Sequence, residues 1–397
     1  MKNVCGPPVQ GDDFRFRDDD VAEILNLLEV GHSVLLIGLR RIGKTSVMMG
    51  VQAQAPASWI VSRHNVQDMR LPSDFFGVLL KSLPKGALDQ LMTGWLKAKT
   101  IPNRVLNAIK SHISKLGGGG AAAEFQTAVI DYWEPLSQGI EQVLADIKTP
   151  FVLILDEFPV LVEHMLVGHT PPVMVESMLG QLKAWREQYP HFRLLIGGSI
   201  SLDRILAKHR ILASTIGDLT RYFLPPLSHD QANAFLQELA DAYTLGWYDE
   251  ARIETSLDLI EDYYPYFLQA FFMQVRLRAN PQEPNLQLVF DNHFMPSIRK
   301  PFFDQFLDRL RTHYPRPEQQ AARRIFDLIA RDETGRANYS QVRSVVDDLD
   351  FDDPVDLDEV LYDLAGDDFL RLDSRTNEYY FATKLIARWW TTTRGRP

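Results

Sequence analysis

One short stretch of the chain contains the residue types that a phosphate group requires. Residues 38–45 read Gly-Leu-Arg-Arg-Ile-Gly-Lys-Thr and match the pattern G-x-x-x-x-G-K-[ST] at every fixed position. The two glycines allow the backbone to curl, so that successive N–H groups face phosphate oxygens. Lys44 supplies a compact cation for the β- and γ-phosphates, and the Thr45 hydroxyl is a hard oxygen ligand for Mg²⁺. We therefore predict that ATP with Mg²⁺ binds here, through Gly38, Arg40, Arg41, Ile42, Gly43, Lys44, Thr45 and Ser46.

The elements on either side of this loop are those that a phosphate-binding loop needs. Val34–Ile37 is a short apolar run typical of a strand buried on both faces, and the chain from Lys44 onward reads as helix. A helix N-terminus directs free N–H groups and a partial positive charge at an anion. The alternative interpretation is a glycine-bounded turn with a surface lysine, and an acidic pair further along the chain argues against it.

That acidic pair follows a wholly apolar run. Phe151–Leu155 leads directly into Asp156 and Glu157. In a parallel sheet, functional groups gather at the carboxyl ends of the strands. We predict that Asp156 holds Mg²⁺ through water and that Glu157 orients or deprotonates the attacking water. The alternative is a strand that simply ends in two solvated carboxylates.

A third candidate is Ser199, which follows the apolar run Leu194–Ile196 and two glycines. Just past the end of a strand, its hydroxyl is placed to contact the γ-phosphate or the attacking water. The same residue is also suited to cap a helix predicted over residues 201–207. The two roles are compatible, and the sequence does not choose between them.

Hydrolysis also requires a positive charge beside the transferred phosphoryl group, to stabilise its negative charge. An arginine from a neighbouring subunit can supply it. Arg204, Arg210 and Arg221 lie between the fourth and fifth predicted strands, and we favour Arg210 or Arg221. The alternative is that both are solvated surface arginines. Within the loop, Arg40 and Arg41 are suited either to contact phosphates or to pin the loop, and the sequence leaves this open.

Strand-length apolar runs alternate with helical patterns through the first 226 residues. The predicted strands are residues 34–37, 59–61, 151–155, 193–196 and 222–224. Strands alternating with helices predict an α/β fold in which a parallel sheet is flanked by helices on both faces. With the phosphate-binding loop after the first strand, this is the arrangement of a P-loop NTPase. Gly117–Gly120 interrupt the helical pattern and predict a flexible loop.

Two further regions lack this alternation. Residues 227–312 read as helices and predict a small lid, whose first helix begins with a capping box at Ser228 and Gln231. Residues 313–397 read as three helices and a β-hairpin over residues 369–382, which predicts a winged helix. The expected domains are therefore an ATPase core at 1–226, a helical lid at 227–312 and a winged-helix domain at 313–397.

Residues 34–46 together resemble the P-loop of the archaeal-type ATPases, which belong to the STAND group of signal-transduction NTPases and are relatives of the AAA+ proteins. Shorter resemblances to other motifs of that family lie at Gly11–Phe14 (ahead of the P-loop), Leu155–Pro159 (Walker B), Gly197–Ser199 (sensor 1) and Tyr264–Gln269 (lid). The chain departs from the family's Gly-x-Pro-x-x-Leu lid pattern by having Tyr263 in place of glycine. No arginine after the fourth predicted strand occupies an unambiguous finger position.

The resemblance implies an ATP-driven switch, in which hydrolysis in the core is coupled to movement of the lid and of the winged helix. Members of the family are implicated in signalling, defence and DNA-linked processes. The resemblance therefore implies a mode of action and does not supply the partner.

Composition adds few constraints. The apolar fraction of 45% and the charged fraction of 24% are ordinary for a globular protein, and 397 residues suffice for two to three domains. The single cysteine, Cys5, cannot form a disulfide within the chain, and no Cys/His cluster has the spacing of a zinc site.

The start of the chain has no signal-peptide pattern, and no apolar run approaches the ~20 residues of a membrane span. We expect a cytoplasmic protein without membrane contact.

Charge disfavours DNA as the main partner. The net charge is −10, and residues 313–397 carry 12 Lys or Arg and 17 Asp or Glu residues, a net charge of −5. No basic residue lies between Arg343 and Arg371, where the recognition helix of a winged helix is expected. Such a surface repels a phosphate backbone. We expect this domain to bind a protein partner, another copy of the chain or its own ATPase core; a solvated acidic face is the alternative.

Three functions are compatible with these motifs. The first is a regulatory STAND-type ATPase that changes state or oligomerises with ATP, and the second is a DNA-associated AAA+-like ATPase similar to initiators or transposition regulators. The third is a P-loop kinase acting on a small molecule. Glu157 next to Asp156 favours water as the acceptor and argues against the kinase, and the acidic third domain argues against the DNA-associated ATPase. We favour the first and keep the second as the alternative.

Overall fold

The structure is a computed structural model, and it describes residues 1–397 apart from 85, 100, 115–126, 128, 169, 350–354 and 395–397. The chain forms two compact units, each assembled from separate segments. The first, called here the sheet unit, comprises Asp18–Ile37 and Val47–Phe223. The second, called the loop-and-lid unit, comprises Met1–Arg17, Gly38–Ser46 and Leu224–Pro397.

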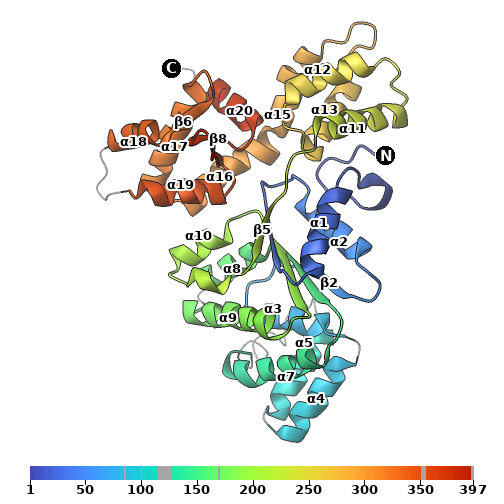
Figure 1. The fold of residues 1–397 in the computed structure, drawn as a ribbon, viewed down its shortest axis with the longest axis vertical. Helices are drawn as coiled ribbons and strands as arrows, with labels where there is room; N and C mark the ends of the chain where they lie inside the picture. The colour runs from blue at the N-terminus through green and yellow to red at the C-terminus, as the bar shows by residue number, and fades with distance from the viewer. Residues whose placement is uncertain are drawn as a thin grey trace. The chain divides into compact units, whose positions relative to one another are not determined.

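Five parallel strands form the sheet of the sheet unit (Figure 1). They are β1 (Val34–Ile37), β2 (Ile60–Asn65), β3 (Phe151–Asp156), β4 (Phe192–Gly197) and β5 (Thr220–Phe223). Their order across the sheet is β2-β3-β4-β1-β5, and every neighbouring pair is parallel. The predicted α/β class and parallel sheet are confirmed. β2 extends further than predicted because it is an edge strand, where polar residues such as Ser62 and Asn65 are tolerated.

Helices cover both faces of this sheet, as right-handed crossovers between parallel strands require. In chain order, the helices between the start of this unit and β5 are α1 (Asp18–Glu29), α2 (Lys44–Gln54), α3 (Pro72–Ser82), α4 (Ala87–Ala98), α5 (Asn103–Ser114), α7 (Trp133–Asp146), α8 (Phe158–Val167), α9 (Pro172–Gln188) and α10 (Leu202–Lys208), followed by the short 3₁₀ turn η2 (Ala213–Thr215). α1 and the Val47–Gln54 part of α2 lie on one face, and α8, α9 and α10 lie on the other (Figure 1). Gly117–Gly120, predicted to be a flexible loop, lie outside the described residues.

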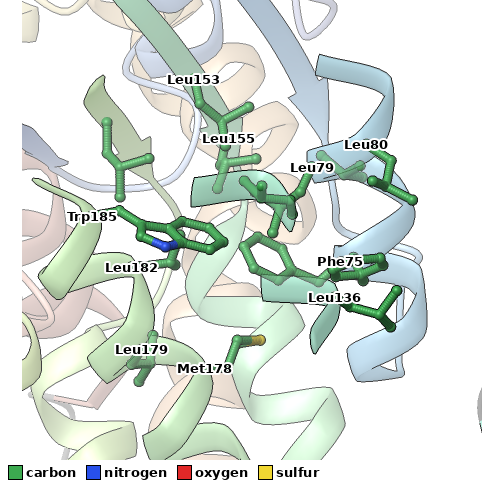
Figure 2. Packing of buried hydrophobic residues seen from close by; sticks show 14 of the residues in the cluster. Phe75, Leu79, Leu80, Leu136, Leu153, Leu155, Met178, Leu179, Leu182 and Trp185 are labelled. Atoms are coloured by element: carbon green, nitrogen blue, oxygen red, sulfur yellow. The ribbon is translucent and has the colours of Figure 1, made fainter. Parts of the chain in front are cut away.

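The main hydrophobic core lies between the sheet and helices α3 to α10 (Figure 2). Alternate residues of a strand face opposite sides of a sheet. Leu153 and Leu155 of β3 therefore point into this core beside Trp185 of α9, whereas Val152 and Ile154 are buried on the opposite face. A strand buried on both faces needs an uninterrupted apolar run, which is why β3 carries no polar residue before its last position.

The register of the sheet aligns the carboxyl ends of three strands. Leu36 of β1 pairs with Gly197 of β4, and Gly197 pairs in turn with Asp156 of β3. Gly38, two residues after Leu36, begins the predicted phosphate-binding loop. The chain therefore enters this loop at the edge of the sheet where β3 ends in an acid, the edge at which ligands bind in open parallel sheets.

Helices make up the central part of the loop-and-lid unit. They are α11 (His229–Ala242), α12 (Glu250–Ile260), α13 (Pro265–Arg278), α14 (Leu286–Val289), the π-helical turn η3 (Phe290–Phe294), α15 (Met295–Ile298), the π-helical turn η4 (Arg299–Phe303) and α16 (Asp304–His313); the 3₁₀ turn η1 (Gly11–Asp13) precedes them in the chain. The capping box predicted at the start of α11 is confirmed. Ser228 Oγ accepts a hydrogen bond from the N–H of Gln231 (3.2 Å), and the Gln231 side chain accepts one from the N–H of Ser228 (2.9 Å).

The remainder of this unit combines helices with a small antiparallel sheet. Its elements are α17 (Arg316–Arg331), β6 (Arg336–Asn338), α18 (Tyr339–Asp347), α19 (Leu357–Gly366), β7 (Leu370–Asp373), β8 (Glu378–Phe381) and α20 (Lys384–Arg394), with the strand order β6-β8-β7. The predicted hairpin is present as β7 and β8, and the three predicted helices as α17, α18 and α19. The assignment of this region as a winged helix stays a prediction. No helix in the described ranges has both the length and the apolarity of a transmembrane span.

Two helical glycines of the sheet unit provide a matched test of its packing. An added Cβ at Gly139 in α7 would lie 2.6 Å from the indole ring of Trp95, whereas at Gly180 in α9 nothing lies within 4 Å. We expect Gly139→Ala to lower the free energy of unfolding by about 1–3 kcal/mol through overpacking. Gly180→Ala should raise it by roughly 0.5–1 kcal/mol, because alanine suits a helix better. Urea denaturation measures both, and equal stabilities would contradict the packing of α7 against Trp95.

Candidate functional site

Two positions in the loop between β1 and α2 require glycine. A Cβ at Gly38, whose φ is +154°, would lie 2.2 Å from the terminal methyl carbon of the buried Ile42 side chain. Gly43 has a φ of +108°, a left-handed conformation that other residues rarely adopt. The two glycines of the sequence pattern therefore determine the bend of the loop. Most substitutions at these two positions would change that bend.

Lys44 folds back over this loop from the start of α2. Its side chain is buried, and Nζ donates hydrogen bonds to the carbonyl oxygens of Gly38 (2.6 Å) and Leu39 (2.8 Å). These bonds fix the position of the ammonium group at the beginning of the loop. Because the ammonium group is largely screened from water, it attracts a nearby anion more strongly than the ammonium group of an exposed lysine would.

Other residues of the loop-and-lid unit fix the remainder of the loop. Ser46 Oγ accepts a hydrogen bond from the N–H of Val9 (3.0 Å), and the guanidinium carbon of Arg41 lies 5.5 Å from the ring centroid of Tyr266 in α13. This cation–π contact favours the loop-pinning alternative for Arg41. Arg40 is exposed. The loop is thus attached to both the N-terminal segment and the predicted lid.

The sheet unit provides the two predicted acids. Asp156 is the last residue of β3 and only 1% exposed. Glu157 follows it with a φ of +61° and precedes the first residue of α8. Left-handed backbone is costly for a residue with a side chain, and such strain concentrates at functional sites.

Ser199 lies against Glu157. Its backbone N–H (2.9 Å) and its hydroxyl (3.0 Å) both donate hydrogen bonds to Glu157 Oε2. The intervening position is crowded, since an added Cβ at Gly198 would lie 2.6 Å from the Pro159 ring. The structure therefore brings together two of the predicted catalytic residues, and Ser199 is hydrogen-bonded directly to the Glu157 carboxylate.

The prediction that Ser199 caps the following helix is wrong. α10 begins at Leu202, and its N-cap is Ser201, whose side chain accepts a hydrogen bond from the N–H of Arg204 (3.3 Å). A capping side chain reaches an amide two or three residues ahead. Ser199 is too far from the first turn of α10 for this, and its hydroxyl is engaged by Glu157 instead.

The candidate finger arginines differ in their surroundings. Arg221 in β5 forms an ion pair with Asp203 of α10, with 2.5 Å between a guanidinium nitrogen and Oδ1. Arg204 is buried within α10. Arg210 follows α10, is exposed, and makes no side-chain hydrogen bond or ion pair with any residue that the structure describes. Arg221 is also exposed, so what distinguishes Arg210 from it is the absence of an ion pair among the described residues.

The donor chemistry at these positions fits Mg²⁺. This ion binds few protein ligands at a triphosphate, because phosphate oxygens and waters fill most of its six positions. Thr45 contributes a half-buried hydroxyl and Asp156 a carboxylate, both hard oxygen donors. Across the described ranges, no three His, Cys, Asp or Glu side chains gather into a metal cluster.

Some contacts at the site come from residues that motif analysis does not single out. Val9 acts through its backbone N–H, which any residue other than proline provides, so its side chain gives no signal. Ser201 carries a recognisable signal, since serine directly before the first residue of a helix is a typical N-cap.

No protein-family model and no curated protein matches this chain. Among solved structures, the chain is similar to the Walker-type ATPase paby2304 of Pyrococcus abyssi, with a TM-score of 0.62, 16% identity, and coverage of 98% of this chain and 99% of that chain. At this identity the likeness shows a shared fold, so the chain has the P-loop NTPase fold.

Two further solved structures are more distant. Cdc6p from Pyrobaculum aerophilum has a TM-score of 0.40 at 15% identity, over 97% of this chain and 94% of that chain. The ORC1 protein of Aeropyrum pernix, solved in complex with DNA, has a TM-score of 0.38 at 14% identity, over 98% and 94%.

The left-handed backbone at Glu157 can be tested by comparing two substitutions. We expect Glu157→Gly to be more stable than Glu157→Ala by about 1–2 kcal/mol, because glycine adopts this conformation without strain. Glu187 in α9 is the matched control: there Gly should be less stable than Ala by about 1 kcal/mol. Chemical denaturation of the four variants gives both differences. The same order at both positions would mean that Glu157 is not held in the left-handed region.

Proposed function

We propose that this protein binds ATP on residues 38–46 and hydrolyses it in a Mg²⁺-dependent reaction. The observation that carries this proposal is the loop itself: a complete G-x-x-x-x-G-K-[ST] sequence whose glycines are required by the backbone and whose Lys44 ammonium is fixed at the loop by two hydrogen bonds. A fixed cation beside a curled backbone suits a triphosphate, because the donors need no reorganisation when the anion arrives. The P-loop NTPase fold supports this activity, but a fold alone does not establish a function.

The proposed chemistry assigns one task to each acid. Asp156, with Thr45, would hold Mg²⁺, which when bound neutralises charge developing on the phosphate oxygens. Glu157 would orient or deprotonate the attacking water. Ser199 donates two hydrogen bonds to one oxygen of Glu157, so we propose that it sets the direction of that carboxylate.

We further propose that the enzyme is regulatory, of the STAND and AAA+-like type, and couples its nucleotide state to a change of conformation or of oligomeric state. The proposed domains are 1–226, 227–312 and 313–397. A DNA-associated AAA+-like ATPase is the alternative, and the net charge of −5 on residues 313–397 disfavours it. ATPase assays with and without duplex DNA separate the two: stimulation by DNA would favour the alternative, and an unchanged rate would favour a protein partner or self-association.

Two substitutions separate binding from hydrolysis. Lys44→Ala should weaken ATP binding about 100-fold, because it removes a cation that two hydrogen bonds fix at the loop. Glu157→Gln should retain ATP binding and lower the rate of hydrolysis by roughly 10²–10⁴-fold, because the amide cannot accept a proton. Titration with a fluorescent ATP analogue measures the first effect, and phosphate release measures the second.

An exposed ion pair on α9 provides matched controls for both changes. Lys183→Ala and Glu187→Gln alter the same residue types at the surface and should leave binding and turnover unchanged. Undiminished hydrolysis by Glu157→Gln would show that another group is the base, and normal binding by Lys44→Ala would contradict the assignment of the loop.

The arginine candidates differ in a way that turnover at varied protein concentration can detect. If Arg210 acts on the ATP site of a second copy, the wild-type rate of hydrolysis per molecule should rise with protein concentration. In that concentration range, Arg210→Ala should lower the rate per molecule by up to about 10³-fold. ATP binding should be unchanged. Arg221→Ala should have a smaller effect, since its guanidinium is engaged by Asp203. A concentration-independent wild-type rate, equal to that of Arg210→Ala, would rule out a finger at this position.

A further inference from the structure

A carboxylate from the far end of the chain lies against the phosphate-binding loop. Asp368, in the turn between α19 and β7, accepts a hydrogen bond at Oδ2 from the backbone N–H of Leu39 (3.1 Å). The two residues are 329 positions apart in sequence and belong to the same compact unit. Asp368 is only 3% exposed, so this contact is formed away from bulk water.

The positive charge of the loop also acts on this carboxylate. Burial raises the pKa of Asp368, and Arg371, the Leu39 amide and the Lys44 ammonium each act in the opposite direction. Lys44 is the residue that the proposed function assigns to the β- and γ-phosphates. Its charge therefore already acts on a carboxyl group in this structure, and that group belongs to the protein itself.

Asp368 also links the loop to the predicted lid. Its second oxygen, Oδ1, accepts a hydrogen bond from Arg371 Nε (3.2 Å), and a terminal nitrogen of Arg371 donates to the hydroxyl of Tyr264 (3.2 Å). Tyr264 is the N-cap of α13, the helix whose Tyr266 lies against Arg41 of the loop. A continuous set of contacts thus runs from the Leu39 amide through Asp368 and Arg371 to the start of α13.

A second set of contacts attaches the C-terminal helix to the same part of the lid. Lys384 Nζ (2.8 Å) and a terminal nitrogen of Arg388 (2.9 Å) donate to the two carboxylate oxygens of Glu261, and the N–H of Leu385 donates to Asp262 Oδ2 (2.8 Å). Glu261 and Asp262 lie between α12 and α13. The turn that carries Asp368 therefore belongs to residues 313–397, called here the C-terminal region, which contact the predicted lid at two places.

We propose that Asp368 is an internal anion that competes with nucleotide phosphate for the loop, and that ATP binding weakens the Asp368–Leu39 contact and releases the C-terminal region. The inference rests on the proposed function, because it needs the loop to be the phosphate site. A phosphate group and the carboxylate draw on the same positive potential, and two negative groups close together in a buried setting repel strongly. By linkage, the contact must lower the affinity for ATP by the same factor by which ATP weakens the contact.

The charge of Asp368, rather than its backbone, is what this proposal uses. Its φ of +56° is left-handed, a conformation that Asn also tolerates. Asp368→Asn should therefore keep the turn and the oxygen that accepts from Leu39, while it removes the negative charge and the hydrogen bond that Oδ1 accepts from Arg371. A purely structural role for Asp368 predicts no change in nucleotide affinity upon this substitution.

The test measures the affinity of the full-length chain for a non-hydrolysable ATP analogue with Mg²⁺. We expect Asp368→Asn to bind about 5–50-fold more tightly than the wild type, the range of typical coupling between two sites. Asp367→Asn is the matched control: Asp367 is also buried in this turn, but its carboxylate accepts hydrogen bonds from Arg309 of α16 and from Tyr314. This control should leave the affinity unchanged even if it lowers the melting temperature.

A second measurement uses the wild-type chain and does not depend on the folding of a variant. Hydrogen exchange of residues 364–373 should become faster when the analogue is bound. Equal affinities of the wild type and Asp368→Asn, or slower exchange in this segment, would overturn the inference while leaving the proposed function intact. Absence of binding by the wild type and both variants would overturn the proposed function, and the inference with it.

Discussion

The concentration of positive potential at one curled loop is the constraint on which the other features depend. The Lys44 ammonium is fixed by two backbone carbonyls of the loop that it serves, so its charge cannot swing away into solvent. Holding a cation in this way is unfavourable unless a negative group is close. The sequence around it is accordingly restricted: Gly38 leaves room for Ile42, and Gly43 permits the left-handed turn into α2. The fixed residues of the G-x-x-x-x-G-K-[ST] pattern are therefore those that allow the loop to bend and Lys44 to be held beside it.

The sheet provides the second requirement, which is the placement of acids at strand ends. β3 is buried on both faces, so its side chains are apolar until the strand reaches the edge of the sheet, where Asp156 ends it. The following left-handed residue, Glu157, turns the chain sharply into α8 and is held by Ser199 from the end of β4. Strand register, rather than loop flexibility, therefore decides where these carboxylates lie.

The sequence predicts those parts of the structure that depend on local pattern. The apolar run of β3, the glycines of the loop and the capping box at Ser228 each follow from the chemistry of a few neighbouring residues, and the parallel sheet follows from their alternation. The same reasoning misplaced the cap of α10, because Ser199 and Ser201 are both suitable serines and only the geometry of the first turn decides between them. β6 escaped prediction since Arg336–Asn338 is short and polar.

Contacts between distant segments are the part that could not be predicted. Asp368 is one of many acids in an acidic region, and nothing in its neighbours distinguishes it from Asp367. Only the fold shows that Asp368 faces the loop and Asp367 faces Arg309. The contact of Arg41 with Tyr266 and the pairing of Arg221 with Asp203 are of the same kind, since each depends on how helices and strands pack.

The most direct test of the account is a crystal structure of the full-length chain with a non-hydrolysable ATP analogue and Mg²⁺. The account predicts that the β- and γ-phosphates lie within hydrogen-bonding distance of Lys44 Nζ and of the loop amides, with the metal ion beside the Thr45 hydroxyl and Asp156. A triphosphate bound elsewhere on the chain, or residues 38–46 without nucleotide at saturating concentration, would contradict it.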